Sequence, residues 1–489
     1  MSRTDFSFAP SALVFLLTML AGCTMVGPDF SKPAAPGVNQ YTENTQPTTV
    51  TDHDVTQTFS RDQDIQADWW KLFHSTALNE LIEVGLKNNP SVAAAEAALV
   101  NARESVSAQR DNLFIPAINA QAGEIRQRLS PEAFGFPGNP STFSLTNASV
   151  QVSYTLDFFG ANRRQIESME AQVEAERYLL QAARVTLAAN IVTTAIREAS
   201  LRDQLHASET VEQLESKTLG ILEIRERLGA VSQTEVQLQR ASLAQARAIV
   251  PGLQKQLAQT RHQLAVYVGK FPGETGLPHF QLKDLTLPQK LPVSVPSALV
   301  HQRPDILISE AQLHQATANL GLTIAGAYPN VTLSASFGAI ATRPGDLFNT
   351  GSSIWSLGGS LVQPLFHGGA LEAEQRAAQA ALDQAAAQYR QTVLNAFQNV
   401  ADVLRALESD ASTLAAQSDA SGASLRSLSL AQAQYASGGI SFLALMNAEE
   451  RQNQTQLALI QAQAARLADS AALFLAMGGG WWNDGRVAP

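Results

Sequence analysis

Apolar residues recur at intervals of three and four positions in two stretches, one in each half of the chain. The first stretch follows Pro90 and contains Val92, Ala95, Leu99, Ala102, Val106, Gln109 and Leu113. The second follows Pro304 and contains Ile306, Ser309, Leu313, Ala316, Leu320, Thr323 and Ala327. This spacing is typical of a seam between packed helices. Pro116 and Pro329 are expected to end the two helices.

Four other stretches alternate between apolar and polar residues, which is typical of strands. We predict strands near 117–128 and 145–157 in the first half, and near 331–341 and 353–363 in the second. Strands of about ten alternating residues fit a transmembrane barrel, although a soluble sheet with one wet face alternates in the same way. Four strands are too few to enclose a water-filled barrel, so a barrel would require several chains.

The longest helical stretch runs from about Ala161 to Leu228 and contains no proline. The chain then turns at Gly229-Ala230-Val231-Ser232 and returns along a second helical stretch to Tyr267. Pro251 lies inside the returning stretch and is expected to kink or break it. Helices of this length need packing partners along their whole length.

The two halves share motifs in the same order, which indicates an internal duplication. Asn89-Pro90-Ser91-Val92 corresponds to Arg303-Pro304-Asp305-Ile306, and the turn from Gly229 to Ser232 corresponds to the turn from Gly438 to Ser441. Repeats of this length are too long for solenoid units of roughly 20–50 residues. We therefore predict two similar halves, repeat 1 over 76–269 and repeat 2 over 298–478, joined by a proline-rich connector over 270–297.

The N-terminus has the pattern of an export signal. Its apolar run, Ala12 to Leu20, is too short for a membrane-spanning helix but suits a signal peptide. Leu20-Ala21-Gly22-Cys23 resembles the bacterial lipobox, whereas the alternative is a core helix with an incidental thiol. We predict a signal peptide over 1–22, a covalent lipid on Cys23 and a lipid-anchored segment over 23–75. Thr24 stands where aspartate would retain a lipoprotein in the inner membrane, which favours the outer membrane.

Composition narrows the function further. The chain has 489 residues, 45% hydrophobic and 16% charged, with a formal net charge of −10. These values argue against wholesale disorder and against a broad basic surface for nucleic acid. The single cysteine excludes an intramolecular disulfide and any multi-cysteine metal site.

Enzyme chemistry is not indicated by any motif in the sequence. There is no GxSxG, P-loop, GxGxxG or HExxH pattern, so we predict no enzyme activity, no metal and no cofactor besides the lipid. Glu449-Glu450 is best explained by a solvated helix face. The pairs Trp69-Trp70 and Trp481-Trp482 are expected to pack where the two ends of the chain meet.

Taken together, these features resemble the TolC-like outer-membrane factors of bacterial efflux pumps, and most of all their OprM- and NodT-type lipoproteins. The resemblance covers essentially the whole mature chain. It is carried by the paired repeats and by five short segments, which are Cys23 to Pro33, Trp69-Trp70, Arg227 to Ser232, Tyr435 to Ser441 and Met477 to Trp482.

The resemblance implies a mixed α+β membrane protein that works as a homotrimer. Each protomer would give four strands to a 12-stranded transmembrane β-barrel and long helices to a coiled-coil tunnel through the periplasm. Segments near 29–75, 270–297 and 479–489, the last a C-terminal equatorial tail, would form a belt around the tunnel. The protein would lie in the outer membrane, in contact with its lipid, and extend into the periplasm.

The implied function is the exit duct of a tripartite efflux pump, which passively passes drugs or other toxic small molecules out of the periplasm. Its partners would be a periplasmic adaptor (membrane fusion) protein and an inner-membrane efflux transporter. The alternatives are a protein-secretion duct with the same fold, or a lipid-anchored periplasmic coiled-coil scaffold or adaptor without a pore. No nucleic acid is expected as a partner.

The resemblance also implies roles for residues at the helical tips. Leu443 matches a leucine ring that narrows the tunnel, and the alternative is that it packs in the helix seam. Asn447 falls where the family has an aspartate ring, and Tyr435 matches a tyrosine that latches the closed tip. The adaptor would face the tips at Gly229, Ser232, Gly438 and Ser441. Because a carboxylate ring favours cations, Asn447 argues against strong cation selectivity.

Overall fold

The computed structural model describes residues 25–43, 48–52, 55–61, 63–483 and 485. The predicted signal peptide and Cys23 lie outside the described residues. The chain forms two compact units. The first unit contains the N-terminal segment to Pro33, 98–176 and 309–389, and the second contains 34–97, 177–308 and 390–489.

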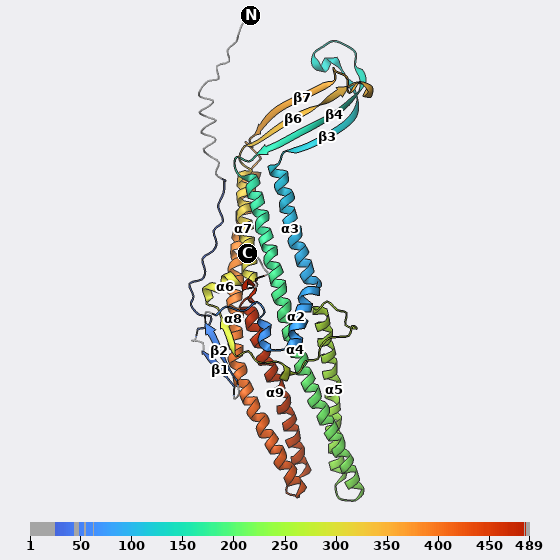
Figure 1. Ribbon diagram of the computed structural model, residues 1–489, viewed down its shortest axis with the longest axis vertical. Helices are drawn as coiled ribbons and strands as arrows, with labels where there is room; N and C mark the ends of the chain where they lie inside the picture. Colours follow the sequence, from blue (N-terminus) through green and yellow to red (C-terminus); the bar gives the residue numbers. More distant parts are fainter. Residues whose placement is uncertain (1–24, 44–47, 53–54, 62, 484, 486–489) are drawn as a thin grey trace. The chain divides into compact units, whose positions relative to one another are not determined.

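The first unit holds a four-stranded antiparallel sheet (Figure 1). Its strands, in the order β3-β4-β6-β7, are β3 (Ala117–Leu129), β4 (Ser141–Leu156), β6 (Asn330–Ala341) and β7 (Ser353–Val362). Strand β4 begins at Ser141 rather than near 145, because residues 141–145 continue the ladder with the end of β3. The alternation read from the sequence sets which residues share a face.

Helices precede and follow each pair of strands along the chain. Helix α3 (Pro90–Phe114) leads into β3 and α4 (Ala161–Arg227) follows β4, while α7 (Pro304–Ala325) leads into β6 and α8 (Ala370–Ala436) follows β7. Pro90 and Pro304 occupy first helical positions, where a missing N–H costs nothing. All four helices continue from one unit into the other.

The second unit contains two long helical hairpins. Helix α4 returns as α5 (Gln233–Tyr267), and α8 returns as α9 (Phe442–Ala476). The two outgoing helices each have 67 residues and the two returning helices each have 35. The buried positions of α5 recur at intervals of three and four residues, as in a seam between helices, and include Val236, Gln239, Leu243, Ala246, Val250, Leu253, Leu257, Thr260 and Leu264.

Pro251 does not break helix α5, which runs unbroken from Gln233 to Tyr267. Of the kink or break expected at Pro251, the break did not occur. Pro251 lies on an exposed face of the helix, so water can satisfy the carbonyl that loses its hydrogen bond there. Seam residues on both sides, such as Val250 and Leu253, keep the helix packed.

A second, three-stranded sheet was not anticipated from the sequence. Strand β2 (Thr56–Arg61) pairs antiparallel with β1 (Thr49–Thr51) and parallel with β5 (Lys290–Val293). Arg466 of α9 is only 1% exposed and forms a buried ion pair with Asp52, which lies between β1 and β2. Its guanidinium also donates to Gln57 Oε1 at 3.1 Å and to the Val55 carbonyl at 3.2 Å. This arginine therefore ties the small sheet to a long helix.

Short helices complete the described residues. They are α2 (Thr76–Asn88), α6 (Pro296–Gln302) and the 3₁₀ turns η1 (Trp69–Phe73), η2 (Pro131–Phe134), η3 (Leu282–Asp284), η4 (Pro344–Asp346) and η5 (Trp481–Asn483). Among the described helices, α4 alone is long and apolar enough to cross a membrane by length and composition. However, 61% of its most apolar window is buried within the protein, as in a core helix.

Candidate functional site

The four-stranded sheet has one apolar face. Cross-strand registers place Ala120, Val150, Phe337 and Trp355 side by side, and the next row is Ile118, Val152, Ala335 and Leu357. Phe337 is 67% exposed and Trp355 is 77% exposed. A single chain therefore presents a broad apolar surface to its surroundings, which in a monomeric soluble protein is unusual.

The opposite face of the same sheet is polar and carries no charge. Its rows contain Gln121, Ser149, Gln151, Ser153, Thr155, Thr332, Ser334, Ser336, Ser356 and Ser360. Three hydrogen bonds join neighbouring strands there: Gln121 Nε2 to Ser149 Oγ at 3.1 Å, Ser336 to Ser356 at 2.8 Å, and Thr155 to Thr332 at 3.3 Å. Along β3, β4, β6 and β7 this face has no Asp, Glu, Lys or Arg.

The turns of the two helical hairpins are capped alike. Ser232 and Ser441 each accept a hydrogen bond through the side chain, from the backbone N–H of Glu235 and Ala444 respectively. Gly229 and Gly438 have φ values of +72° and +77°, a left-handed conformation that favours glycine. All four tip residues predicted to face the adaptor are exposed.

One apolar cluster joins the two tips. Its buried members come from four helices and are Leu222, Val236, Ala431, Phe442 and Leu445. Tyr435 packs against this cluster, with its ring centroid 5.6 Å from that of Phe442. Burial raises the pKa of the Tyr435 hydroxyl, and Glu235 raises it further. Tyr435 therefore contacts the core that holds the hairpins together.

Leu443 and Asn447 are not part of this apolar tip cluster. Both are exposed and lie four residues apart on α9, so they share one helix face. Leu443 is 53% exposed, so within one chain it is not part of the seam. The structure therefore brings Leu443 and Asn447 together on a free surface and separates them from Tyr435.

Glu215 and Glu449 form an interacting pair of carboxyl groups near the tip cluster. No sequence pattern indicated this pair. Glu215 of α4 is 5% exposed and accepts a hydrogen bond from Gln239 of α5. Burial, together with the charge of Glu215, raises the pKa of Glu449 to about 7. The expectation that Glu449 belongs to a solvated face was wrong, because packing of the second hairpin against α4 partly buries it. Glu450 remains exposed.

These carboxyls predict a pH dependence of tip stability. Because the pKa of Glu449 is raised from 4.5 to about 7 in the folded tip, the folded state holds its proton more tightly than the unfolded chain. The stabilisation is complete below pH 4.5 and is lost as the pH rises from 4.5 through 7. The full shift corresponds to about 3 kcal/mol, and solvent screening of this partly exposed carboxyl reduces the expected loss to about 1–2 kcal/mol. Glu449→Gln should flatten this slope in hydrogen exchange of α9 amides. If Glu449→Gln keeps the wild-type dependence of stability on pH, or if Glu450→Gln flattens it equally, then Glu449 is not the titrating group.

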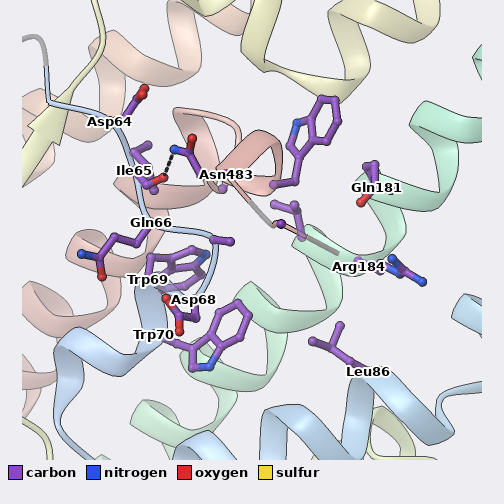
Figure 2. Close-up of a pocket in the computed structure, with 15 residues that line it drawn as sticks. Asp64, Ile65, Gln66, Asp68, Trp69, Trp70, Leu86, Gln181, Arg184 and Asn483 are labelled. Atoms are coloured by element: carbon purple, nitrogen blue, oxygen red, sulfur yellow. Dashed lines mark hydrogen bonds between the residues drawn. The ribbon is translucent and has the colours of Figure 1, made fainter. Parts of the chain in front are cut away.

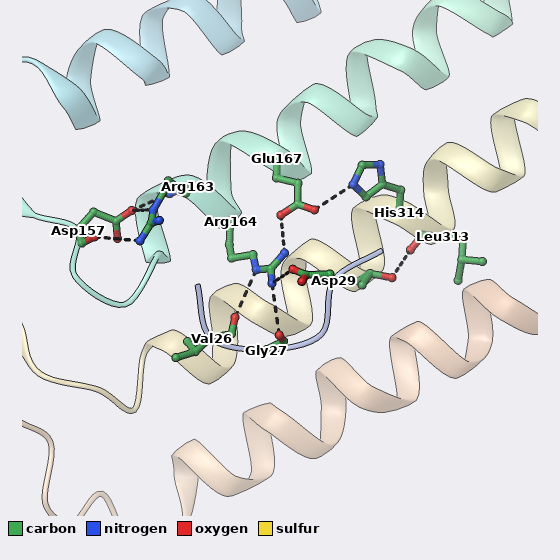
Figure 3. A network of polar contacts seen from close by, with 10 residues as sticks. Val26, Gly27, Asp29, Asp157, Arg163, Arg164, Glu167, Leu313 and His314 are labelled. Carbon is green, nitrogen blue, oxygen red and sulfur yellow. Dashed lines mark hydrogen bonds and ion pairs between the residues drawn. The ribbon is translucent and has the colours of Figure 1, made fainter. Parts of the chain in front are cut away.

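The described N-terminal segment is held by a buried arginine in the first unit (Figure 3). Arg164 of α4 is 1% exposed and donates to the carbonyls of Val26 and Gly27, each at 3.3 Å. It also contacts Asp29 Oδ1 and Glu167 Oε2, each at 2.7 Å. The chain from Val26 to Asp29 is therefore fixed to helix α4.

Two further contacts continue this attachment along α7. Glu167 Oε1 lies 3.0 Å from His314 Nε2, and the His314 ring stacks on Phe30 at 4.3 Å. Gly27 has a φ of +88°, and a Cβ there would lie 2.6 Å from Cα of Gly321. Glycine is thus required where the segment crosses α7.

Three of the four paired tryptophans, Trp69, Trp70 and Trp481, line a cleft of about 560 Å³ in the second unit (Figure 2). The Trp69 ring stacks on Phe474 at a centroid distance of 5.0 Å. Trp481 Nε1 donates to the Gln302 carbonyl at 2.8 Å, and Asn483 Nδ2 donates to the Ile65 carbonyl at 2.8 Å. These contacts fasten the end of α9 and the residues after it to the segment before α2 and to the end of α6.

The sequence of this chain matches the family described as Outer membrane efflux protein over residues 81–270 and 295–479. The chain belongs to the outer membrane efflux protein family. This membership places it in the bacterial outer membrane as an efflux channel. The family is one of channels rather than of enzymes.

Curated relatives of this outer membrane efflux protein match over nearly the whole chain. The probable efflux pump outer membrane protein TtgC of Pseudomonas putida is 29% identical over 492 residues, which cover 99% of this chain and 97% of TtgC. The probable outer membrane lipoprotein SilC of Salmonella typhimurium is 26% identical over 467 residues, covering 95% of this chain and 97% of SilC.

The solved structure of the outer-membrane channel OprN has the same fold. It superimposes with a TM-score of 0.84 at 28% sequence identity, covering 93% of this chain and 99% of OprN. The open state of the MtrE outer membrane channel of Neisseria gonorrhoeae superimposes with a TM-score of 0.81 at 26% identity, covering 95% of this chain and 100% of MtrE.

Proposed function

We propose that three copies of this outer membrane efflux protein form the exit duct of a tripartite pump. The observation that carries the proposal is the sheet β3-β4-β6-β7, whose edge strands β3 and β7 each pair on one side only among the described residues. In lipid, open edges leave backbone groups unsatisfied, so the sheet must close. Three copies would close it as a 12-stranded barrel, with the apolar face toward lipid and the uncharged polar face toward water.

The same proposal gives the long helices the role of a periplasmic tunnel. The equal lengths of α4 and α8, and of α5 and α9, support an origin by duplication. The small sheet β1-β2-β5, the connector over 270–297 and the tail after α9 would form the belt. The predicted domain boundaries at 76, 270, 298 and 479 belong to this proposal.

The cargo follows from the relatives by analogy. Their names include an antibiotic efflux protein, a toluene efflux protein and a pyoverdine export protein. All of these are small molecules, so we infer small toxic or exported compounds rather than proteins as cargo. Deleting the gene should sensitise cells to a set of small toxic compounds. Unchanged sensitivity together with loss of a secreted protein would favour the secretion duct instead.

Both partners would act at the periplasmic end of the duct. A periplasmic adaptor would dock on the exposed tips at Gly229, Ser232, Gly438 and Ser441, and the inner-membrane transporter would supply the energy.

The described residues contain no group of three or more His, Asp or Glu side chains placed to hold a metal. We infer a passive duct whose only attached group is the lipid.

The tip would form the gate. Leu443 would narrow the closed mouth by bulk and dewetting, Asn447 would line it one helical turn away, and Tyr435 would keep the hairpins together through the tip cluster. The exposure of Leu443 and Asn447 within one chain supports their facing a shared axis.

Replacing Asn447 with aspartate should raise the preference of the channel for cations. Three carboxylates in one ring would lower the energy of a cation at the constriction. The measurement is the reversal potential in a salt gradient across a planar bilayer. An unchanged reversal potential would remove Asn447 from the pore.

The lipid anchor should be auxiliary to insertion. A closed barrel already holds the trimer in the membrane, so Cys23→Ala should reduce the amount that reaches the outer membrane while inserted trimers still conduct. Membrane fractionation and single-channel recording measure the two effects separately. Inserted Cys23→Ala trimers that do not conduct would contradict this role.

A further inference from the structure

Three charged side chains stand on the apolar face of the four-stranded sheet. The register of β3 places Glu124, Arg126 and Arg128 on the same face as Ile118, whose cross-strand partner is Val152. They are the only Asp, Glu, Lys or Arg residues on either face of the four strands. Their clustering at one end of one strand calls for a physical explanation, because charges facing lipid are costly.

Their position along the sheet explains why the fold tolerates them. The ladder between β4 and β6 ends at the pair Thr146 and Ala341, whereas the ladder between β3 and β4 continues to Leu129 and Ser141. Arg126 and Arg128 lie on this projecting part, opposite Ser144 and Thr142.

The apolar face below them is long enough to cross a membrane core. On β4 its apolar positions lie between Leu156 and Ala148, a stretch of about nine residues, and a tilted transmembrane strand needs about 9–11. Arg126 and Arg128 begin beyond that band, at the hairpin end away from the helices. This is the level at which lipid headgroups start.

The two guanidinium groups are available for a ligand. Both side chains are exposed, and neither forms an ion pair with any residue in the described part of the chain, Glu124 included. Their cross-strand neighbours Ser144 and Thr142 are short, so they leave room beside the guanidinium groups. Residues two apart on one strand lie roughly 7 Å from each other, close enough for both arginines to reach one headgroup.

We propose that Arg126 and Arg128 bind a phosphate group of a phosphorylated glycolipid in the outer leaflet. Arginine matches phosphate through paired, charge-assisted hydrogen bonds, and the two arginines outnumber the single carboxylate of Glu124. The inference rests on the proposed barrel and its orientation. Because β3 is an edge strand, the bound lipid would lie at the junction with the next protomer and stabilise the trimer.

The test uses purified full-length trimers in detergent and diphosphorylated lipid A as the probe. Bound lipid is counted by native mass spectrometry, and trimer dissociation is followed by heating. Arg126→Gln/Arg128→Gln should weaken lipid A binding by roughly ten-fold or more, because charge-assisted hydrogen bonds are lost, and should cancel the lipid-dependent rise in dissociation temperature. Arg376→Gln/Arg390→Gln on α8 removes the same charge from exposed sites and should bind like the wild-type protein.

Three outcomes would overturn the site. The first is wild-type binding of lipid A by the Arg126→Gln/Arg128→Gln variant, and the second is equal binding of dephosphorylated lipid A by the wild-type protein. The third is an equal stabilisation by inorganic phosphate alone, which would mean a free anion rather than a lipid. Recording the conductance of the same variant separates the lipid site from the proposed barrel. A conducting variant with undiminished lipid binding refutes the lipid site alone. Wild-type protein that neither inserts nor conducts refutes the barrel.

Discussion

Val152→Lys is expected to prevent stable insertion of the protein into the outer membrane. Val152 lies midway along the apolar positions of β4, in a row with Ile118, Ala335 and Leu357. A lysine facing the middle of the bilayer costs about 2–4 kcal/mol in each chain, and a trimer carries it three times. Membrane fractionation and resistance of the trimer to dissociation in detergent measure the loss.

Ser153→Lys is the matched control for this prediction. Ser153 follows Val152 directly on β4, and its side chain points to the opposite, uncharged face. The same charge there should leave insertion intact and shift the channel toward anions. If Val152→Lys inserts as well as the wild-type protein, or if Ser153→Lys is the variant that fails, then the assignment of the two faces is wrong.

Arg466→Met is expected to release the small sheet from helix α9. Without the guanidinium, the Asp52 carboxylate stays 9% exposed and loses its ion pair with Arg466. Gln57 Oε1 loses the Arg466 donor, and the Val55 carbonyl keeps only the hydrogen bond from the Asp52 N–H. Removing one partner of a buried ion pair costs about 3–5 kcal/mol. Hydrogen exchange of the β2 amides measures the free energy of opening, which should fall by this amount.

Two variants make this prediction specific. Arg405 forms an ion pair with Glu408 on the surface of α8, so Arg405→Met should change stability by only about 0–1 kcal/mol. Adding Asp52→Ala to Arg466→Met removes the carboxylate that has lost the guanidinium and should restore part of the loss. No recovery in the double variant would mean that packing of the Arg466 stem, rather than the ion pair, holds the sheet.

Periodicity was enough to locate the long elements. The three-and-four stepping of α5 and the alternation of β3, β4, β6 and β7 repeat over many residues, so each signal is averaged along a whole element. The hairpin tips were readable because a left-handed turn favours glycine and a helix start favours serine, as at Gly229 and Ser232.

The small sheet and the polar networks could not be read in this way. Strands β1, β2 and β5 have three to six residues, which is too short for an alternating pattern. Arg164 meets Asp29 across 135 positions, and Arg466 meets Gln57 across 409. Such pairs are brought together only by tertiary folding. Burial of Glu449 likewise depends on packing of the second hairpin against α4, which no local pattern records.

We expect the proposed channel to select only weakly between cations and anions. The sheet face proposed to line the barrel has no Asp, Glu, Lys or Arg along its four strands, and the predicted gate carries Asn447 in place of a carboxylate. A pathway lined by hydroxyls and amides stabilises neither sign of ion strongly. It would therefore pass cargo of either charge.

Single-channel recording from purified trimers in a planar bilayer tests the central claim most directly. A water-filled barrel of three chains predicts long-lived conductance steps, which increase when Tyr435→Ala loosens the tip cluster. Pure, folded, membrane-extracted protein that conducts nothing, with Tyr435→Ala as well as without it, would show that the chain does not form an open duct.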